Sequence, residues 1–142
     1  MERRTLRLPG DILNAISAAG PDDIWAVGTA TVPNTVVTLH WDGSNWSPFT
    51  NELAAVALDD ITVSGPDDAW AVGTGPDVGP LTAHWDGQSW RAVPNVSGFT
   101  LHSAKSFARD DVWAVGRTQT ESLAIHYADP CKSGQVGVPA SR

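Results

Sequence analysis

Apolar and polar residues alternate over short segments of this chain, and the alternation predicts β-strands. Between two turn signals, the apolar side chains of Val37, Leu39 and Trp41 share one face of an extended segment. The residues that follow, Asp42 and Gly43, are typical of a hairpin turn in which the glycine takes a positive φ. No stretch keeps the 3.6-residue apolar period of a helix. The pattern therefore predicts an all-β protein of short antiparallel strands.

This pattern is repeated along the chain. The first block of each repeat contains Trp-Ala-Val-Gly, and its copies are Gly20–Gly28, Gly65–Gly73 and Ala108–Gly116. The second block, His-Trp-Asp-Gly-x-x-Trp, begins at His40 and at His84, and is reduced to His-Tyr-Ala-Asp at His126. Both blocks recur at intervals of 42 to 45 residues, which is the signature of a repeat architecture.

Each repeat is predicted to contain four strands. The first strand begins near Leu13, Leu58 or Leu101 in the three repeats. A Pro-Asp-Asp or Arg-Asp-Asp turn connects it to the second strand. The fourth strand begins at Trp46 in the first repeat and at Trp90 in the second. Four strands in about 40–45 residues make one blade of a β-propeller. We therefore predict a β-propeller of four-stranded antiparallel blades, three per chain, in a single domain over residues 1–142. The blades are expected at 11–52, 53–98 and 99–128, with an N-terminal strand at 3–10 that completes a blade, and a tail or outer strand at 129–142.

The repeated frame of Asp-Asp-x-Trp-Ala-Val-Gly followed by His-Trp-Asp-Gly-x-x-Trp resembles the tectonin-type propeller repeat and, more loosely, Asp-box and WD-type repeats. The resemblance extends from Leu13 to about Ala128. Because tectonin-type propellers are often lectins, the resemblance implies carbohydrate binding. It also implies an extracellular or cell-surface location. This sequence departs from the family because it has three units and because the third has lost Trp-Asp-Gly-x-x-Trp. No signal peptide is visible, since no apolar stretch follows the arginines at the start.

Composition and charge narrow the range of partners. The net charge of −7 makes nucleic acid an unsuitable ligand. The longest apolar run, Leu53–Leu58, is far too short for membrane insertion. Cys131 is the single cysteine, which excludes an internal disulfide and a zinc site of several thiolates. We expect no cofactor.

Residues shared by all units are assigned to the scaffold, because every blade needs the same packing and turns. Trp25, Trp70 and Trp113 are predicted to pack blade against blade. The set Trp41, Trp85 and Tyr127 is predicted to be core. The histidines His40, His84 and His126 are each expected to bond a local Asp or Ser and not a metal, because equivalent positions on adjacent blades lie about 10 Å apart. The paired aspartates 22–23, 67–68 and 110–111 are assigned to turns.

Residues that differ between units are candidates for ligand binding. The loops between second and third strands vary in length and sequence, and they lie with the blade-linking segments on one face of a propeller. Loops on a rigid scaffold commonly carry binding residues. Trp46 and Trp90, which open outer strands, are expected to be more exposed than the other tryptophans. The candidate ligand contacts are Trp46, Trp90, Asn34, Asp77, Asn95, Arg117, Gln119 and Glu121, with no catalytic or metal-binding residue among them.

The main functional hypothesis is a non-enzymatic, lectin-like propeller in which aromatic faces stack on sugars and Asp, Asn and Gln bond hydroxyls. The alternative is a protein–protein interaction scaffold, or a fragment of a larger propeller. A glycan-active enzyme would need a single pair of acids in unlike environments, and nothing pairs Asp59, Asp60 or Glu121 in that way. Because three blades do not close a ring, we expect a homo-oligomer, with a six-blade dimer as the simplest form, or a longer parent chain.

Overall fold

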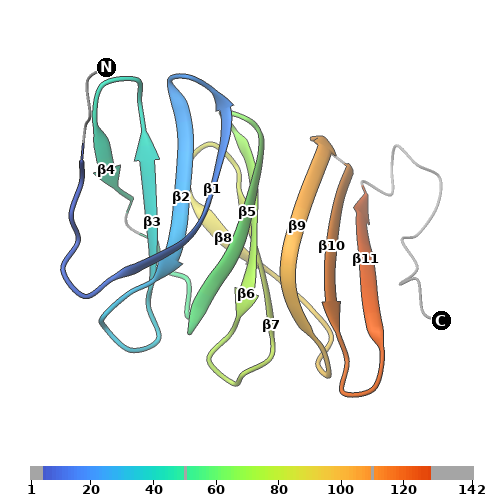
Figure 1. The fold of residues 1–142 in the computed structure, drawn as a ribbon. Helices are drawn as coiled ribbons and strands as arrows, with labels where there is room; N and C mark the ends of the chain where they lie inside the picture. The colour runs from blue at the N-terminus through green and yellow to red at the C-terminus, as the bar shows by residue number, and fades with distance from the viewer. Residues whose placement is uncertain (1–4, 50, 110, 129–142) are drawn as a thin grey trace.

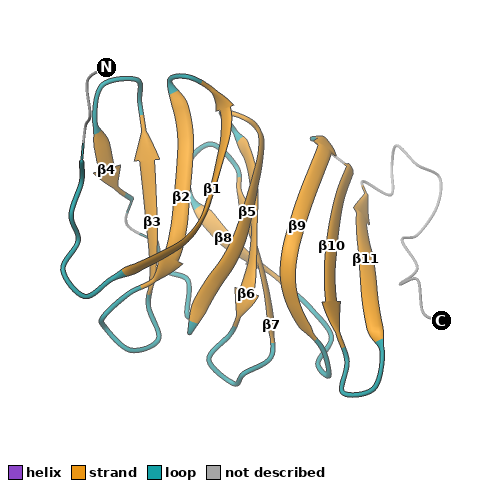
Figure 2. Ribbon diagram, viewed as in Figure 1, coloured by secondary structure: helices purple, strands orange, loops and turns teal. Residues whose placement is uncertain are grey.

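The computed structural model describes residues 5–49, 51–109 and 111–128, which form three antiparallel sheets (Figure 1). Blade 1 contains β1 (Ile12–Gly20), β2 (Asp23–Thr29), β3 (Val36–Trp41) and β4 (Trp46–Pro48). Blade 2 contains β5 (Ala57–Gly65), β6 (Asp68–Thr74), β7 (Pro80–Trp85) and β8 (Trp90–Val93). Blade 3 contains β9 (Thr100–Ala108), β10 (Asp111–Arg117) and β11 (Ser122–Ala128). Figure 2 shows strands and loops only over these ranges, so they contain no helix that could cross a membrane.

Each blade is a meander in which every strand pairs with the next one along the chain. The predicted four-stranded blade is confirmed for blades 1 and 2, whereas blade 3 has three strands within the described ranges. The outer strand considered for 129–142 lies outside the described residues. The first strands β1, β5 and β9 contact one another in series, so they form the inner side of an open arc of sheets.

The N-terminal strand predicted at 3–10 is wrong for residues 5–10, which form no strand; residues 3 and 4 lie outside the described residues. Leu8 instead packs against Ala26, Val37 and Leu39, which lie on the face of blade 1 turned away from blade 2. That face is apolar and no described blade covers it. Leu8 covers part of it, because burying apolar surface is favourable.

The β3–β4 and β7–β8 turns, at the upper end of the arc in Figure 1, follow from Asp-Gly pairs. Gly43 and Gly87 both have φ of 93°, so the predicted positive φ is confirmed. In blade 1, Asp42 Oδ1 accepts hydrogen bonds from the amides of Ser44 and Asn45, both at 2.8 Å. The amides of Asn45 and Ser44 also lower the pKa of the Asp42 carboxyl, because hydrogen bonds to a carboxylate favour its charged form.

The glycine that ends each Trp-Ala-Val-Gly block allows the first two strands of a blade to approach closely. A Cβ on Gly73 would collide with the carbonyl oxygen of Ala57, and the same collision would occur at Gly28 and Gly116 with their own first strands. In blade 2, the close approach coincides with a register shift between Leu58 and Asp60 in β5. The repeated glycine is therefore required by strand contact.

A cluster of aromatic rings joins blade 1 to blade 2. Trp25, from β2, is 1% exposed, and its ring centroid lies 4.9 Å from that of Trp85 and 5.5 Å from that of Trp90. Phe49 contacts both Trp25 and Trp85. Leu58 and the other apolar residues of β5–β7 complete the cluster. The prediction that Trp25 packs blade against blade is confirmed.

The junction between blades 2 and 3 has less aromatic surface and more hydrogen bonds. Trp70 stacks on Tyr127 at 5.6 Å between ring centroids, in place of the tryptophan pair of the first junction. The Tyr127 hydroxyl donates to Asn95 Oδ1 at 2.8 Å and lies 3.0 Å from Thr82 Oγ1. Asp60 Oδ2 accepts from the amide of Ala104 at 2.9 Å. Polar contacts therefore fix blade 3 in place.

Each blade is also held by a His–Asp pair beneath a tryptophan ring. His40 bonds Asp23, His84 bonds Asp68 and His126 bonds Asp111, at 2.7–2.8 Å between Nε2 and Oδ1. The predicted partnership between each histidine and a local acid is confirmed. The second aspartate of each Asp-Asp sequence thus begins the second strand of its blade, and its bond to the histidine links that strand to the third.

Candidate functional site

The variable loops gather on one face of the arc, the lower face in Figure 1, together with the β8–β9 link. The β2–β3, β6–β7 and β10–β11 loops all lie there, and the Asp-Asp and Asp-Gly turns lie on the opposite face. The antiparallel meander requires this separation, since alternate turns of a sheet fall at opposite ends. The predicted division of the two faces is confirmed.

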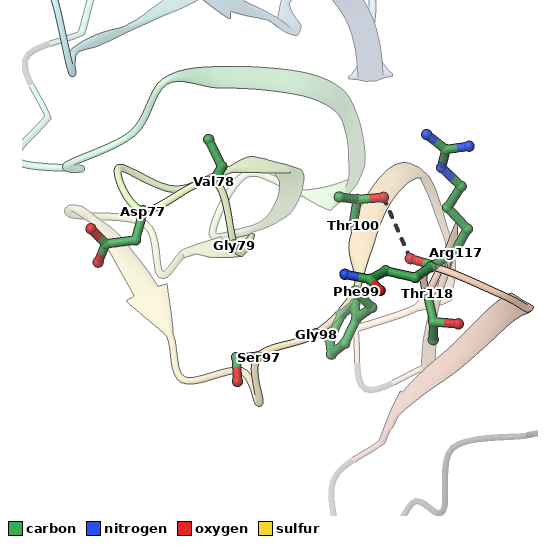
Figure 3. Close-up of a pocket in the computed structure, with 10 residues that line it drawn as sticks. Asp77, Val78, Gly79, Ser97, Gly98, Phe99, Thr100, Arg117 and Thr118 are labelled. Atoms are coloured by element: carbon green, nitrogen blue, oxygen red, sulfur yellow. Dashed lines mark hydrogen bonds between the residues drawn. The ribbon is translucent and has the colours of Figure 1, made fainter.

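A groove of about 450 Å³ lies on this face, where blades 2 and 3 meet. Three segments form it: the β6–β7 loop, the β8–β9 link and the end of β10 with its following loop (Figure 3). Of the predicted contacts, Asp77, Arg117 and Gln119 line it. The further lining residues are Val78, Gly79, Ser97, Gly98, Phe99, Thr100 and Thr118.

Local hydrogen bonds hold the loops that form the groove. In the β6–β7 loop, the Gly75 amide donates to the Gly79 carbonyl at 2.9 Å, and the Val78 amide donates to the Gly75 carbonyl at 3.1 Å. After β10, Thr118 Oγ1 accepts from the Glu121 amide at 3.0 Å. These bonds close two tight loops on either side of the groove.

Val78 has a φ of 53° and is 76% exposed. A β-branched residue rarely adopts this left-handed conformation, which costs of order 1–3 kcal/mol. The hydrogen-bonded loop imposes the conformation, and it presents an isopropyl group to solvent at the rim of the groove. Val78 lines the groove, so one exposed aliphatic side chain stands at its edge.

The groove has a buried apolar wall and charged rims. Phe99 is 9% exposed and packs with Val72 and Leu101 at the junction of blades 2 and 3. Figure 3 shows Asp77 and Arg117 on opposite sides, with Phe99 and Gly98 between them. The Thr100 hydroxyl donates to the Arg117 carbonyl at 3.5 Å, which ties the arginine backbone to the first strand of blade 3. The site offers an anionic rim, a cationic rim and backbone groups between them.

The other predicted loop contacts lie elsewhere. Asn34 sits in the β2–β3 loop, and its carbonyl accepts from the Ala55 amide at 3.3 Å, so it belongs to the junction of blades 1 and 2. Glu121 lines a separate open hollow with His102 and Val115. Asn95 donates to Thr82 at 3.0 Å and accepts from Tyr127. The side-chain amide of Asn95 therefore stabilises the junction between blades 2 and 3.

The two outer-strand tryptophans differ from each other. Trp90 is 5% exposed and lies in the cluster between blades 1 and 2, so the expectation that its position would expose it is wrong. Trp46 is half-buried against the Leu8 cluster on the outer face of blade 1. The blade-to-blade contact explains the difference, since the equivalent face is covered in blade 2 and open in blade 1.

Sequence reasoning did not identify Val78 or Phe99 as site residues. A signal was present for Val78, because it is an isolated apolar residue in a segment of Gly, Pro and Asp. Phe99 precedes an apolar strand and has the pattern of a core residue. Within the described ranges, no group of three or more His, Cys, Asp or Glu side chains could hold a metal ion.

Comparisons with known proteins agree with the fold. No family model matches the chain, and no curated protein matches it in sequence. The chain is similar to the solved structure of YCF48 bound to D1 peptide, with a TM-score of 0.65 and 22% identity over 94% of this chain. The match covers 41% of that chain, so this chain spans about two fifths of its neighbour. Because YCF48 is a propeller protein, the three sheets correspond to propeller blades.

Proposed function

We propose that this chain is a non-catalytic, propeller-type module for protein interaction, and that its loop-face groove binds an extended segment of a partner protein. The observation that carries this proposal is the exposed side chain of Val78 at the edge of a groove with Asp77 on one rim and Arg117 on the other. Protein interfaces combine apolar contacts at the centre with polar and charged groups at the rim.

The same features favour a peptide over a sugar. Lectin-like binding rested on stacking by Trp46 and Trp90, and Trp90 is buried between blades. Neither tryptophan lines the groove. Its one aromatic residue, Phe99, is buried in the junction and offers little ring face for stacking. The neighbour YCF48 binds the D1 peptide, which adds support for a propeller surface that accepts a protein segment.

The proposal is tested by selecting binders from a displayed library of random peptides on the immobilised 142-residue protein. Enriched peptides are then titrated by calorimetry against the wild type, Val78→Asp and Arg117→Ala. We expect binding to weaken at least tenfold in both variants, because one loses an apolar contact and the other a cation. Val32→Asp is the matched control, since Val32 is also an exposed loop valine (61%) but lies in blade 1, outside the groove.

Three results would count against the proposal. They are the absence of any enriched peptide, equal weakening by Val78→Asp and Val32→Asp, and peptide binding that neither groove variant affects. A glycan array supplies the opposing measurement, because saturable binding to a sugar together with no peptide binding would restore the lectin hypothesis.

A further inference from the structure

The outer face of blade 1 exposes residues that are core residues in the other blades. Leu13 is 50% exposed and Ile16 is 64% exposed. Their equivalents in blade 2, Leu58 and Ile61, are 0% and 3% exposed because blade 1 covers them. The outer face of blade 1 therefore has the residue types of a blade junction. Among the described residues, no blade packs against this face.

The outer face of blade 3 exposes the other half of a junction. Trp113 is 39% exposed and Val115 is 48% exposed, whereas their equivalents Trp25 and Val27 are 1% and 0% exposed beneath blade 2. Trp113 stacks on His126 at 4.4 Å between ring centroids, and Trp25 and Trp70 contact their own histidines at 4.5 and 4.4 Å with the rings tilted. The tryptophan–histidine contact of the occupied junctions is thus already present on this open face.

The two outer faces are complementary because the chain already joins the same two surfaces twice. In each occupied junction, the second-strand tryptophan of one blade meets an aromatic residue at or next to the end of the third strand of the next blade. Trp25 meets Trp85, and Trp70 meets Tyr127. The corresponding residue of blade 1 is Trp41, which is half-buried. A third junction of this kind would place Trp113 against Trp41.

We propose that the two outer faces bind a second copy of this chain, with blade 3 of each copy against blade 1 of the other. Two copies give six blades, within the four to eight that typically close a propeller ring, whereas three copies would give nine. A two-fold axis relates the copies, so both new junctions form together and leave no unmatched face. This assembly stands independently of the peptide groove, which lies on the loop face.

Two features distinguish the new junction from the internal ones. Leu8 covers part of the blade 1 face and must move aside. In the internal junctions, Ser17 Oγ accepts the Val63 amide at 3.1 Å, and Thr62 Oγ1 accepts the Ser106 amide at 2.9 Å. Blade 3 has Lys105 at the equivalent position, and an ammonium group donates but does not accept hydrogen bonds. We therefore expect a dimer that dissociates on dilution.

Sedimentation velocity over a concentration series tests this assembly. We expect the wild type to shift from one to two chain masses as concentration rises, with no larger species. Ile16→Glu and Val115→Glu each place a carboxylate in one half of the junction, and we expect at least a hundredfold weaker dimer because a buried unpaired charge is costly. Val32→Glu is the matched control, because it adds the same charge to the loop face and should leave the dimer unchanged.

Mixing the variants tests which faces meet. Ile16→Glu keeps an intact blade 3 face and Val115→Glu keeps an intact blade 1 face, so an equimolar mixture should form a dimer through one junction although each alone stays monomeric. Val115→Thr provides a milder change of similar volume, for which we expect dimerisation about tenfold weaker. Circular dichroism and tryptophan fluorescence establish that each variant is folded.

The assembly is overturned if the folded wild type remains one chain mass at every concentration. It is also overturned if the mixture of folded Glu variants fails to dimerise, since another pair of faces must then be in contact. Growth into long chains instead of a two-chain species would show head-to-tail contact without a closed ring, and would likewise overturn the two-copy ring.

Discussion

At the scale of single residues, the repeat predicted which side chains are structural, and the structure supplied their partners. The histidines were expected to bond a local Asp or Ser, and they bond Asp23, Asp68 and Asp111. Both aspartates of each pair had been assigned to the turn. Spacing alone does not distinguish them, because adjacent residues of a strand point to opposite faces and the strand start was uncertain by a residue.

Asp68 provides a test of the His–Asp pairs. Burial raises the pKa of its carboxyl, but the hydrogen bonds from His84, Ser64 and Trp70 outweigh burial and leave the pKa below the usual 3.8. We expect Asp68→Asn to lower the free energy of unfolding by about 2 kcal/mol at neutral pH, because a buried, charge-assisted hydrogen-bond network is broken. Urea denaturation followed by tryptophan fluorescence measures the change.

Asp111→Asn is the matched control, because Asp111 makes the same bond to a histidine while its side chain is 46% exposed, against 2% for Asp68. Asp111→Asn should therefore lower the free energy of unfolding clearly less than Asp68→Asn does. The pH dependence has a definite sign: the contribution of Asp68 is fully present above pH 3.8 and is lost as pH falls through the lower pKa of the folded state. The stabilising role of buried Asp68 would be contradicted if Asp68→Asn and Asp111→Asn lowered the free energy of unfolding equally. It would also be contradicted if the effect of Asp68→Asn grew towards low pH.

At the scale of elements, strand order followed from the sequence, while the N-terminal segment did not. The sequence Thr5-Leu6-Arg7-Leu8-Pro9 aligns with Trp90–Pro94, which opens with the fourth strand of the second unit. This likeness predicts a strand, but pairing requires an available edge in the correct place. On its own blade, Leu8 finds apolar contacts with Ala26 and Leu39 instead. Local sequence sets strand propensity, whereas the choice of partner depends on which surfaces the remainder of the fold leaves open.

The glycine at the end of each Trp-Ala-Val-Gly block gives a test at this scale. We expect Gly73→Ala to destabilise the protein by about 3 kcal/mol, since the added Cβ collides with backbone of β5 and not with a flexible side chain. Gly79→Ala is the control, because a Cβ there meets nothing within 4 Å. Thermal unfolding of both variants measures the effect, and equal midpoints would show that β5 adjusts without cost.

At the scale of the whole molecule, the sequence predicted which face carries the variable loops, but it did not predict the groove. Asp77 and Arg117 come from different blades and are 40 residues apart. They line one groove because the junction of blades 2 and 3 sets the distance between their loops. Asn34 and Glu121, chosen by the same reasoning, lie at other positions. Blade packing is a property of side-chain volumes at the junction, which strand patterns do not specify.

Tyr127 tests how strongly the arc depends on its junctions. Its hydroxyl reaches Asn95 and Thr82 across the junction of blades 2 and 3, and Tyr127→Phe removes both contacts while keeping the stacking on Trp70. Because each blade touches only its neighbours, stability is a sum of local terms. We expect the free energy of unfolding of blade 3 to fall by about 1 kcal/mol. Amide exchange in β9–β11 should then be about fivefold faster, while exchange in β1–β4 is unchanged. Hydrogen exchange in the Val115→Glu background measures this in a single chain, and uniform acceleration over all three blades would show one cooperative unit instead.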